Sequence, residues 1–311
     1  MNLKIVFMGS ADFAVPILQK LSEDFEIKGV VTQPDRPAGR GKILTPPAVK
    51  ILAQKLGIPF IQPNRLNEPQ AWQQLIDWNP DLIVVAAFGQ ILKSNVLQLP
   101  PYGCLNVHAS LLPRWRGAAP IAAAILHGDK QTGVTIMKMD EGIDTGPILK
   151  QKSIGIMEDD TTGTLTQRLA IEGANLLIET IPEYINGDCI PTAQDHTLAT
   201  YAPMLKKEDG MLDFNTPSAV LLRKIRAYNP WPTAYTTLHQ QRLIILEAQI
   251  YPQSHPGIKP GQTMIFEKTP MIATADSFLK LITIQLAGKK PVSGKEFLHG
   301  FRQWGVITLP S

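Results

Sequence analysis

The chain has 311 residues, of which 44% are hydrophobic and 18% are charged, and its formal net charge is +3. This composition is ordinary for a globular protein with a large core, and the length favours two domains over one. No apolar run of about 18 residues is present, which argues against a membrane-spanning helix.

Cys104 and Cys189 are the only cysteines, too few for a disulfide framework or a structural zinc site. The first residues enter a predicted strand at once, so we expect no signal peptide. Together these features predict a cytoplasmic protein with reduced thiols and no metal.

Charge is distributed unevenly along the chain. Residues 1–205 hold 17 Lys or Arg and 20 Asp or Glu, whereas residues 206–311 hold 13 and 7. A basic second domain is typical of a protein that binds a polyanion, although a solvated lysine surface gives the same balance.

Strands and helices alternate in the first part of the chain. Continuous apolar runs, typical of buried parallel strands, are separated by segments with helical spacing. The predicted strands are 3–9, 25–33, 59–63, 80–89, 104–108 and 132–140, and the predicted helices are 12–23, 47–57, 68–79, 118–128 and 162–187. This order predicts an α/β domain, over residues 1–189, with a mostly parallel, Rossmann-like sheet covered on both faces.

The pattern changes after a linker predicted at 190–207. A helix at 218–228 is followed by short β-branched strands within 233–251, 262–276 and 277–288. Closely spaced strands with turn residues between them predict a small antiparallel barrel or sandwich over residues 208–311.

Phosphate-binding motifs are absent from the sequence. Gly9 follows the first strand, but "MGSADFAV" lacks the second and third glycines of a dinucleotide-binding turn, and there is no Walker A sequence. Nicotinamide chemistry and phosphoryl transfer from ATP therefore have no support.

Three polar residues are the candidates for catalysis. Asn106 and His108 lie on one face of the strand 104–108, and Asp144 follows the strand 132–140. If these strands were parallel, all three would lie at the carboxyl edge of the sheet, where α/β proteins bind ligands. An amide can donate to a developing oxyanion, an imidazole can carry charge, and a carboxylate can orient the imidazole. No nucleophilic Ser or Cys motif is present, so direct acyl transfer fits better than a covalent intermediate. The same three residues could also be hydrogen-bonded scaffolding.

Two loops have an unusual composition. "SLLPRWRG" is stiff and basic, as ligand-binding loops often are. Residues 32–50, "TQPDRPAGRGKILTPPAVK", form a long loop with basic residues, which predicts either a clamp on a nucleic-acid end or a solvated flap.

These segments resemble the methionyl-tRNA formyltransferase family. The likeness rests on "KIVFMGSADFAVPIL", "TQPDRPAGRGK", "NVHASLLPRWRGAAPI", "MDEGIDTGPIL", "IRAYNPWPTAY" and "AGKKPVSGKEFLHG", which span nearly the whole chain. The Asn–x–His, SLLP and Asp pattern is shared with other enzymes that use 10-formyltetrahydrofolate, so it implies the reaction class and not the acceptor.

The resemblance implies that 10-formyltetrahydrofolate donates a formyl group to the amine of initiator methionyl-tRNA. It assigns catalysis to Asn106, His108 and Asp144. The folate-site residues it implies are Ser110, Leu111, Leu112 and Pro113, and the tRNA-binding residues are Arg36, Arg40 and Lys42. It also implies an OB-fold-like second domain that holds tRNA phosphates. We expect a monomer.

Other functions stay open at this point. A sugar-nucleotide or purine-intermediate formyltransferase would keep the three catalytic residues without needing the basic loop. A formyltetrahydrofolate hydrolase would release formate with no acceptor, and a non-catalytic RNA-binding module would not need His108.

Overall fold

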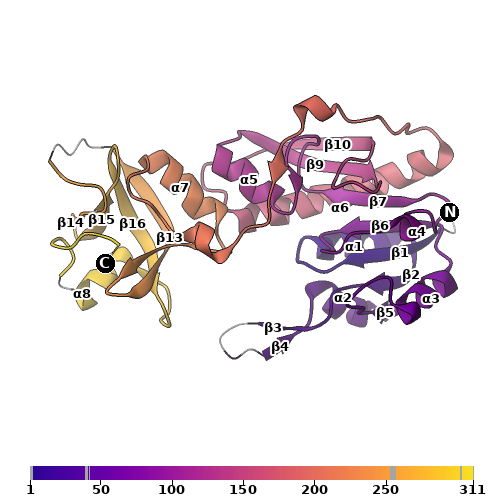
Figure 1. Cartoon of the computed structure of the whole chain (residues 1–311), viewed down its shortest axis with the longest axis horizontal. Helices are drawn as coiled ribbons and strands as arrows, with labels where there is room; N and C mark the ends of the chain where they lie inside the picture. The colour runs from indigo at the N-terminus through magenta and orange to yellow at the C-terminus, as the bar shows by residue number, and fades with distance from the viewer. Residues whose placement is uncertain (1–2, 39–40, 42, 253–256, 302, 311) are drawn as a thin grey trace. The chain divides into compact units, whose positions relative to one another are not determined.

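The structure is a computed structural model that describes residues 3–38, 41, 43–252, 257–301 and 303–310. The chain forms two compact units (Figure 1). The first comprises residues 1–120, 131–155 and 166–202, and the second comprises residues 121–130, 156–165 and 203–311.

The first unit is built on a seven-stranded sheet in the order β10-β9-β7-β6-β1-β2-β5 (Figure 1). Its strands are β1 (Lys4–Gly9), β2 (Glu26–Val31), β5 (Phe60–Ile61), β6 (Leu82–Ala86), β7 (Cys104–His108), β9 (Gln131–Lys138) and β10 (Ile148–Gly155). The central strands β6 and β7 are fully buried, as the unbroken apolar sequence of β6 predicts. The predicted α/β class with a mostly parallel sheet is confirmed.

One edge of this sheet is antiparallel. Strand β9 runs antiparallel to β7, with Asn106 opposite Met137 and His108 opposite Thr135, and β10 runs antiparallel to β9. The carboxyl end of β9 therefore lies beside the amino end of β7. The argument that Asp144 lies near β7 because the two strands are parallel was wrong.

Helices connect the strands of the first unit. They are α1 (Ala14–Asp24), α2 (Ala48–Leu56), α3 (Pro69–Trp78), α4 (Ser94–Leu97), α5 (Pro120–His127) and α6 (Thr162–Asn186). Of these, α5 falls almost entirely in the second unit, and α6 begins in that unit. Gly57 ends α2 in the left-handed region, with φ of 68°, as the sequence predicts for a helix that stops at glycine. A Cβ on Gly9 would lie 2.8 Å from the carbonyl oxygen of Ala86, so glycine lets β1 turn close to β6.

Two small strand pairs complete this unit. Strands β3 (Arg36–Ala38) and β4 (Ile43–Thr45) form an antiparallel hairpin within the long basic loop. Strands β8 (Arg116–Gly117) and β11 (Tyr201–Ala202) are parallel, and this pairing joins the segment after β7 to a segment after α6.

The second unit contains a six-stranded antiparallel sheet (Figure 1). Its strands are β12 (Ala234–Leu238), β13 (Gln241–Tyr251), β14 (Thr263–Phe266), β15 (Thr269–Ala273), β16 (Phe278–Leu286) and β17 (Val292–Ser293). The helices α7 (Ser218–Ala227) and α8 (Gly294–Gly300) also belong to this unit. Apolar residues of β13 and β16 pack with Leu221, Ile225 and Phe297 from the two helices into one core. The predicted β-rich antiparallel unit is confirmed, whereas its likeness to an OB-fold stays a prediction.

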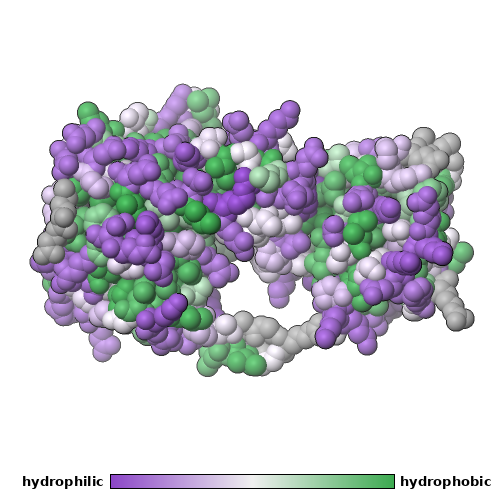
Figure 2. All heavy atoms as spheres, turned by 180° about the vertical axis from the view of Figure 1, so that it is seen from behind, coloured by the Kyte–Doolittle hydropathy of each residue, from purple (hydrophilic) through white to green (hydrophobic). Residues whose placement is uncertain are grey.

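Hydrophilic side chains cover most of the face shown in Figure 2, with smaller groups of apolar residues between them. This distribution is ordinary for a protein that buries its apolar strands. Within the residues described, no helix combines the length and apolar character needed to cross a membrane.

Candidate active site

Strand β7 carries two of the candidate residues into the interior. Asn106 and His108 alternate with Leu105 and Val107, so both polar side chains project from one face of the sheet. The exposed fractions of these two residues are 9% and 6%. Polar side chains buried to this extent normally have hydrogen-bond partners.

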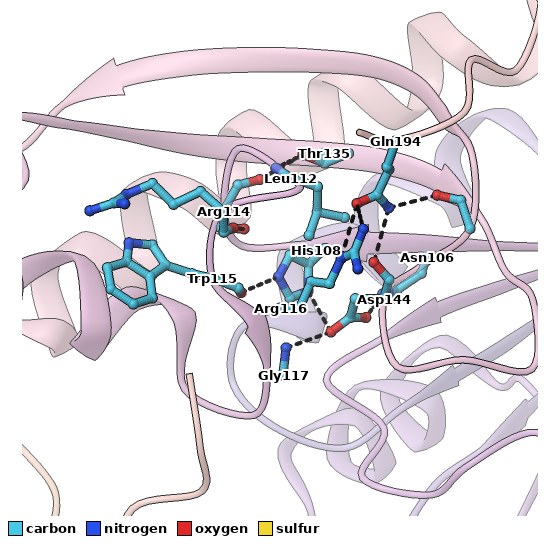
Figure 3. A network of polar contacts seen from close by, with 12 residues as sticks. Asn106, His108, Leu112, Arg114, Trp115, Arg116, Gly117, Thr135, Asp144 and Gln194 are labelled. Carbon is cyan, nitrogen blue, oxygen red and sulfur yellow. Dashed lines mark hydrogen bonds and ion pairs between the residues drawn. The ribbon is translucent and has the colours of Figure 1, made fainter. Parts of the chain in front are cut away.

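Asp144 reaches these residues from the loop between β9 and β10 (Figure 3). Its Oδ1 accepts a hydrogen bond from Asn106 Nδ2 at 3.3 Å, and its Oδ2 lies 3.5 Å from His108 Nδ1. The backbone N–H of Gly117 donates to the same Oδ2 at 2.8 Å. The structure thus brings Asn106, His108 and Asp144 together, and adds a backbone donor that has no signature in the sequence.

The backbone of Asp144 is in the left-handed region, with φ of 52°. This conformation costs a non-glycine residue about 1 kcal/mol, although aspartate tolerates it better than most residues. The carboxylate is therefore held by a backbone that needs support from its surroundings.

Both ring nitrogens of His108 face oxygen atoms. Nε2 lies 3.0 Å from the carbonyl oxygen of Trp115, which can only accept, so Nε2 carries a hydrogen. Nδ1 faces the Asp144 carboxylate, 3.5 Å from Oδ2. Oxygen atoms on both sides thus fix the orientation of the ring beside a carboxylate.

The segment expected to contact folate is tied to the sheet. The buried Ser110 hydroxyl donates to the carbonyl oxygen of Arg114, and Thr135 Oγ1 donates to the carbonyl oxygen of Ser110. The backbone N–H of Leu112 donates to Thr135 Oγ1 and its carbonyl oxygen accepts from Gln151 Nε2, so both backbone groups are engaged within the protein. Leu112 is buried, whereas Leu111 and Pro113 are half-buried.

Two residues of the network were not predicted from the sequence. Arg116 is almost fully buried, with 1% exposure, and its Nε and Nη2 donate to Gln194 Oε1 at 3.1 and 2.7 Å. Gln194 Nε2 in turn donates to the backbone carbonyl oxygen of Asp144 at 2.9 Å (Figure 3). The basic segment "SLLPRWRG" drew attention to the loop that holds Arg116 but not to this residue, and no sequence signal identifies Gln194.

Of the residues expected to bind tRNA, only Arg36 is described. It is exposed on β3, and its Nη2 donates to Gln33 Oε1 at 2.7 Å. Arg40 and Lys42 lie outside the described residues.

Metal ligands do not gather in the described parts of the chain, where no group of three or more His, Cys, Asp or Glu is placed to hold an ion. The thiol of Cys104, at the start of β7, is buried, and this burial raises its pKa to about 12.

The chain matches two families along most of its length. Residues 3–181 match the formyl transferase family, and residues 204–302 match the formyl transferase C-terminal domain. The methionyl-tRNA formyltransferase of Bacillus licheniformis is 47% identical over 300 residues, which are 96% of this chain and 95% of that protein. The chain belongs to the methionyl-tRNA formyltransferase family. The corresponding protein of Roseiflexus castenholzii is 44% identical and covers 98% of both chains.

Solved structures share the fold at low sequence identity. A sugar 3N-formyl transferase, WlaRD, has a TM-score of 0.66 at 20% identity and covers 93% of this chain and 100% of its own. The methionyl-tRNA formyltransferase of Clostridium thermocellum has a TM-score of 0.56 at 16% identity, with 80% and 94% covered. The predicted family, and with it the prediction of a formyltransferase enzyme, are confirmed.

Proposed function

We propose that the site on β7 transfers the formyl group of 10-formyltetrahydrofolate directly to the α-amino group of methionyl-initiator tRNA. The observation that supports this most directly is the convergence of Asn106, His108 and Asp144, with no more than 3.5 Å between the interacting atoms. The near full-length similarity to methionyl-tRNA formyltransferases favours charged initiator tRNA as the acceptor.

The reaction forms one C–N bond and breaks another. The amine nitrogen attacks the formyl carbon, negative charge develops on the formyl oxygen, and collapse of this intermediate breaks the bond to N10 of the folate. The amine loses a proton and N10 gains one. Groups that stabilise the oxyanion and accept the amine proton are therefore required.

Asn106 and His108 stabilise the oxyanion in this proposal. One Nδ2 hydrogen of Asn106 points to Asp144, which leaves the second for the formyl oxygen. Because Nε2–H of His108 is donated to Trp115, we assign His108 the role of a fixed positive charge in preference to that of a proton donor.

Asp144 holds His108 and accepts the amine proton. Each of its carboxylate oxygens has two lone pairs, so the bonds from Asn106 and Gly117 leave capacity for an ammonium or amine hydrogen. Leu111, Leu112 and Pro113 contribute apolar surface to the folate site, and Ser110 acts by shaping the loop through its internal hydrogen bond.

The tRNA is held by charge in this proposal. Residues 208–311 form an OB-fold-like, tRNA-binding domain that follows a catalytic domain of residues 1–189 and a linker of residues 190–207. Arg36, Arg40 and Lys42 act at the acceptor end. We propose that the protein acts as a monomer in the cytoplasm, where charged tRNA and folate are present.

A formyl-transfer assay with a labelled formyl donor tests the function. The acceptors are initiator methionyl-tRNA, elongator methionyl-tRNA and an amino-sugar nucleotide, with a reaction that lacks any acceptor. Rapid labelling of the initiator alone supports the proposal. Labelling of the sugar amine instead contradicts the acceptor, and release of formate without an acceptor points to a hydrolase.

A further inference from the structure

Arg116 is a buried cation that contacts an amide and an imidazole. Its guanidinium donates to Gln194 Oε1, and Nη1 and Nη2 each lie 3.2 Å from Nδ1 of His196. No carboxylate among the described residues forms a salt bridge with it. An unpaired buried charge is unfavourable, and apolar residues of similar volume often serve stability equally well. Packing alone therefore does not account for an arginine at this position.

The guanidinium fixes the orientation of the Gln194 amide. An arginine side chain only donates, so the amide oxygen must face Arg116 and the NH₂ group must face the opposite way. A flipped amide would place two donors against each other. Both hydrogens of that NH₂ group are then directed at the loop between β9 and β10.

The same NH₂ group holds the backbone on both sides of Thr145. Gln194 Nε2 donates to the carbonyl oxygen of Asp144 at 2.9 Å and to that of Gly146 at 2.7 Å. These two bonds pin the loop where Asp144 takes its left-handed conformation. Gln194 is itself buried, with 6% exposure, so few other positions are open to it.

Arg116 and Gly117 act on Asp144 from adjacent positions of β8. Gly117 N–H holds the carboxylate directly, while Arg116 holds the backbone carbonyl through Gln194 (Figure 3). β8 is held in place by its pairing with β11, within the unit that contains β7.

We propose that Arg116 and Gln194 are positioning residues that hold the Asp144 backbone so that its carboxylate meets Asn106 and His108. They act through Asp144 and do not touch the substrates. The inference rests on the proposed function, because its measure is the rate of formyl transfer.

Gln194→Glu is the sharpest test. A glutamate still accepts from Arg116, so the fold should be retained, but it has no hydrogens for the two loop carbonyls. We expect kcat to fall about 10- to 100-fold, since small displacements of a catalytic group cost this much, with KM for both substrates within about twofold. The matched control is Gln98→Glu, the same change at an exposed position, which should leave kcat unchanged.

Two further variants separate positioning from folding. In Arg116→Met/Gln194→Met no buried charge is left unpaired, so the chain should still unfold cooperatively in a thermal melt while kcat falls about 10- to 100-fold. In a double-mutant cycle, Gln194→Glu should cost nothing further when Asp144 is already Ala, measured in single turnover.

These results distinguish the possible failures. If the wild-type chain formylates initiator methionyl-tRNA but Gln194→Glu keeps kcat within about twofold, the positioning role is wrong while the proposed function stands. An undiminished loss in the Asp144→Ala background would also overturn it, because the effect would then not pass through Asp144. If the wild-type chain transfers no formyl group to tRNA, the proposed function itself fails.

Discussion

The end of β7 and the β3–β4 hairpin place polar groups in opposite environments. Asn106 and His108 are nearly inaccessible, and each has its partners fixed within about 3.5 Å. Arg36 on the hairpin is exposed, and its Nη2 donates to the side chain of Gln33. Buried dipoles and charges act strongly at fixed positions, whereas exposed charges act weakly and are screened by salt. The first environment suits a chemical step and the second suits recognition of a polyanion.

The largest expected effect comes from removing a buried side chain that stabilises the proposed oxyanion. Asn106→Ala and His108→Ala should each lower kcat about 10²- to 10³-fold, because each removes stabilisation of the oxyanion. KM for tRNA should change little, and the loss should not depend on salt. Steady-state kinetics and a thermal melt of each variant measure this, and a near-normal kcat would remove that residue from the mechanism.

The strands at this site could be predicted because their sequences are mostly apolar and β-branched. Asn106 and His108 were chosen as candidates because they are two polar residues at alternate positions of one such strand. Asp144 was placed near them for a reason that proved wrong, since β9 is antiparallel and the loop after it returns to β7. Apolar patterning predicts that a strand exists and is buried, but not its direction in the sheet.

Contacts between distant segments could not be predicted in the same way. Arg116 meets Gln194 across 78 positions of sequence, and the pairing of β8 with β11 depends on the path of the intervening chain. Gly117 N–H acts through the backbone, which every residue type except proline shares. A single sequence carries no pattern for either interaction.

A smaller effect is expected from removing an exposed charge on the β3–β4 hairpin. Arg36→Ala should raise KM for tRNA several-fold with little change in kcat, and should lower the slope of log affinity against log salt by about one. Lys55→Ala removes a positive charge from α2 in the same unit and is the matched control. A fall in kcat equal to that of His108→Ala would place Arg36 in the chemical step and undo the contrast.

A third prediction concerns acid stability in the second unit. Asp276 Oδ1 accepts from Ser218 N–H at the start of α7, and this bond lowers the pKa of the carboxyl below its ordinary value of 3.8. A carboxyl whose pKa is lower in the folded state than in the unfolded state stabilises the protein at pH values above its unfolded-state pKa. This stabilisation is lost as the pH falls through the folded-state pKa. The urea concentration at the unfolding midpoint of the full chain should therefore decrease as the pH is lowered through this acid range.

Asp276→Asn provides the comparison for that measurement. Asparagine keeps an acceptor for Ser218 but does not titrate, so its midpoint should vary less than that of wild type below pH 3.8. The difference should be small, because Asp276 is exposed and its charge is screened. Identical acid dependence in the two proteins would show that this carboxylate does not couple to folding.

The smallest effect is expected at Cys104, which shares β7 with Asn106 and His108. Its burial raises the pKa of the thiol to about 12, so almost none is thiolate at mildly alkaline pH. Native protein treated with iodoacetamide should keep its Cys104 thiol and its activity, whereas unfolded protein should react. Alkylation of native Cys104, detected by mass spectrometry, would mean that β7 opens to solvent. The fixed distances on which the proposed oxyanion chemistry depends could then not be maintained.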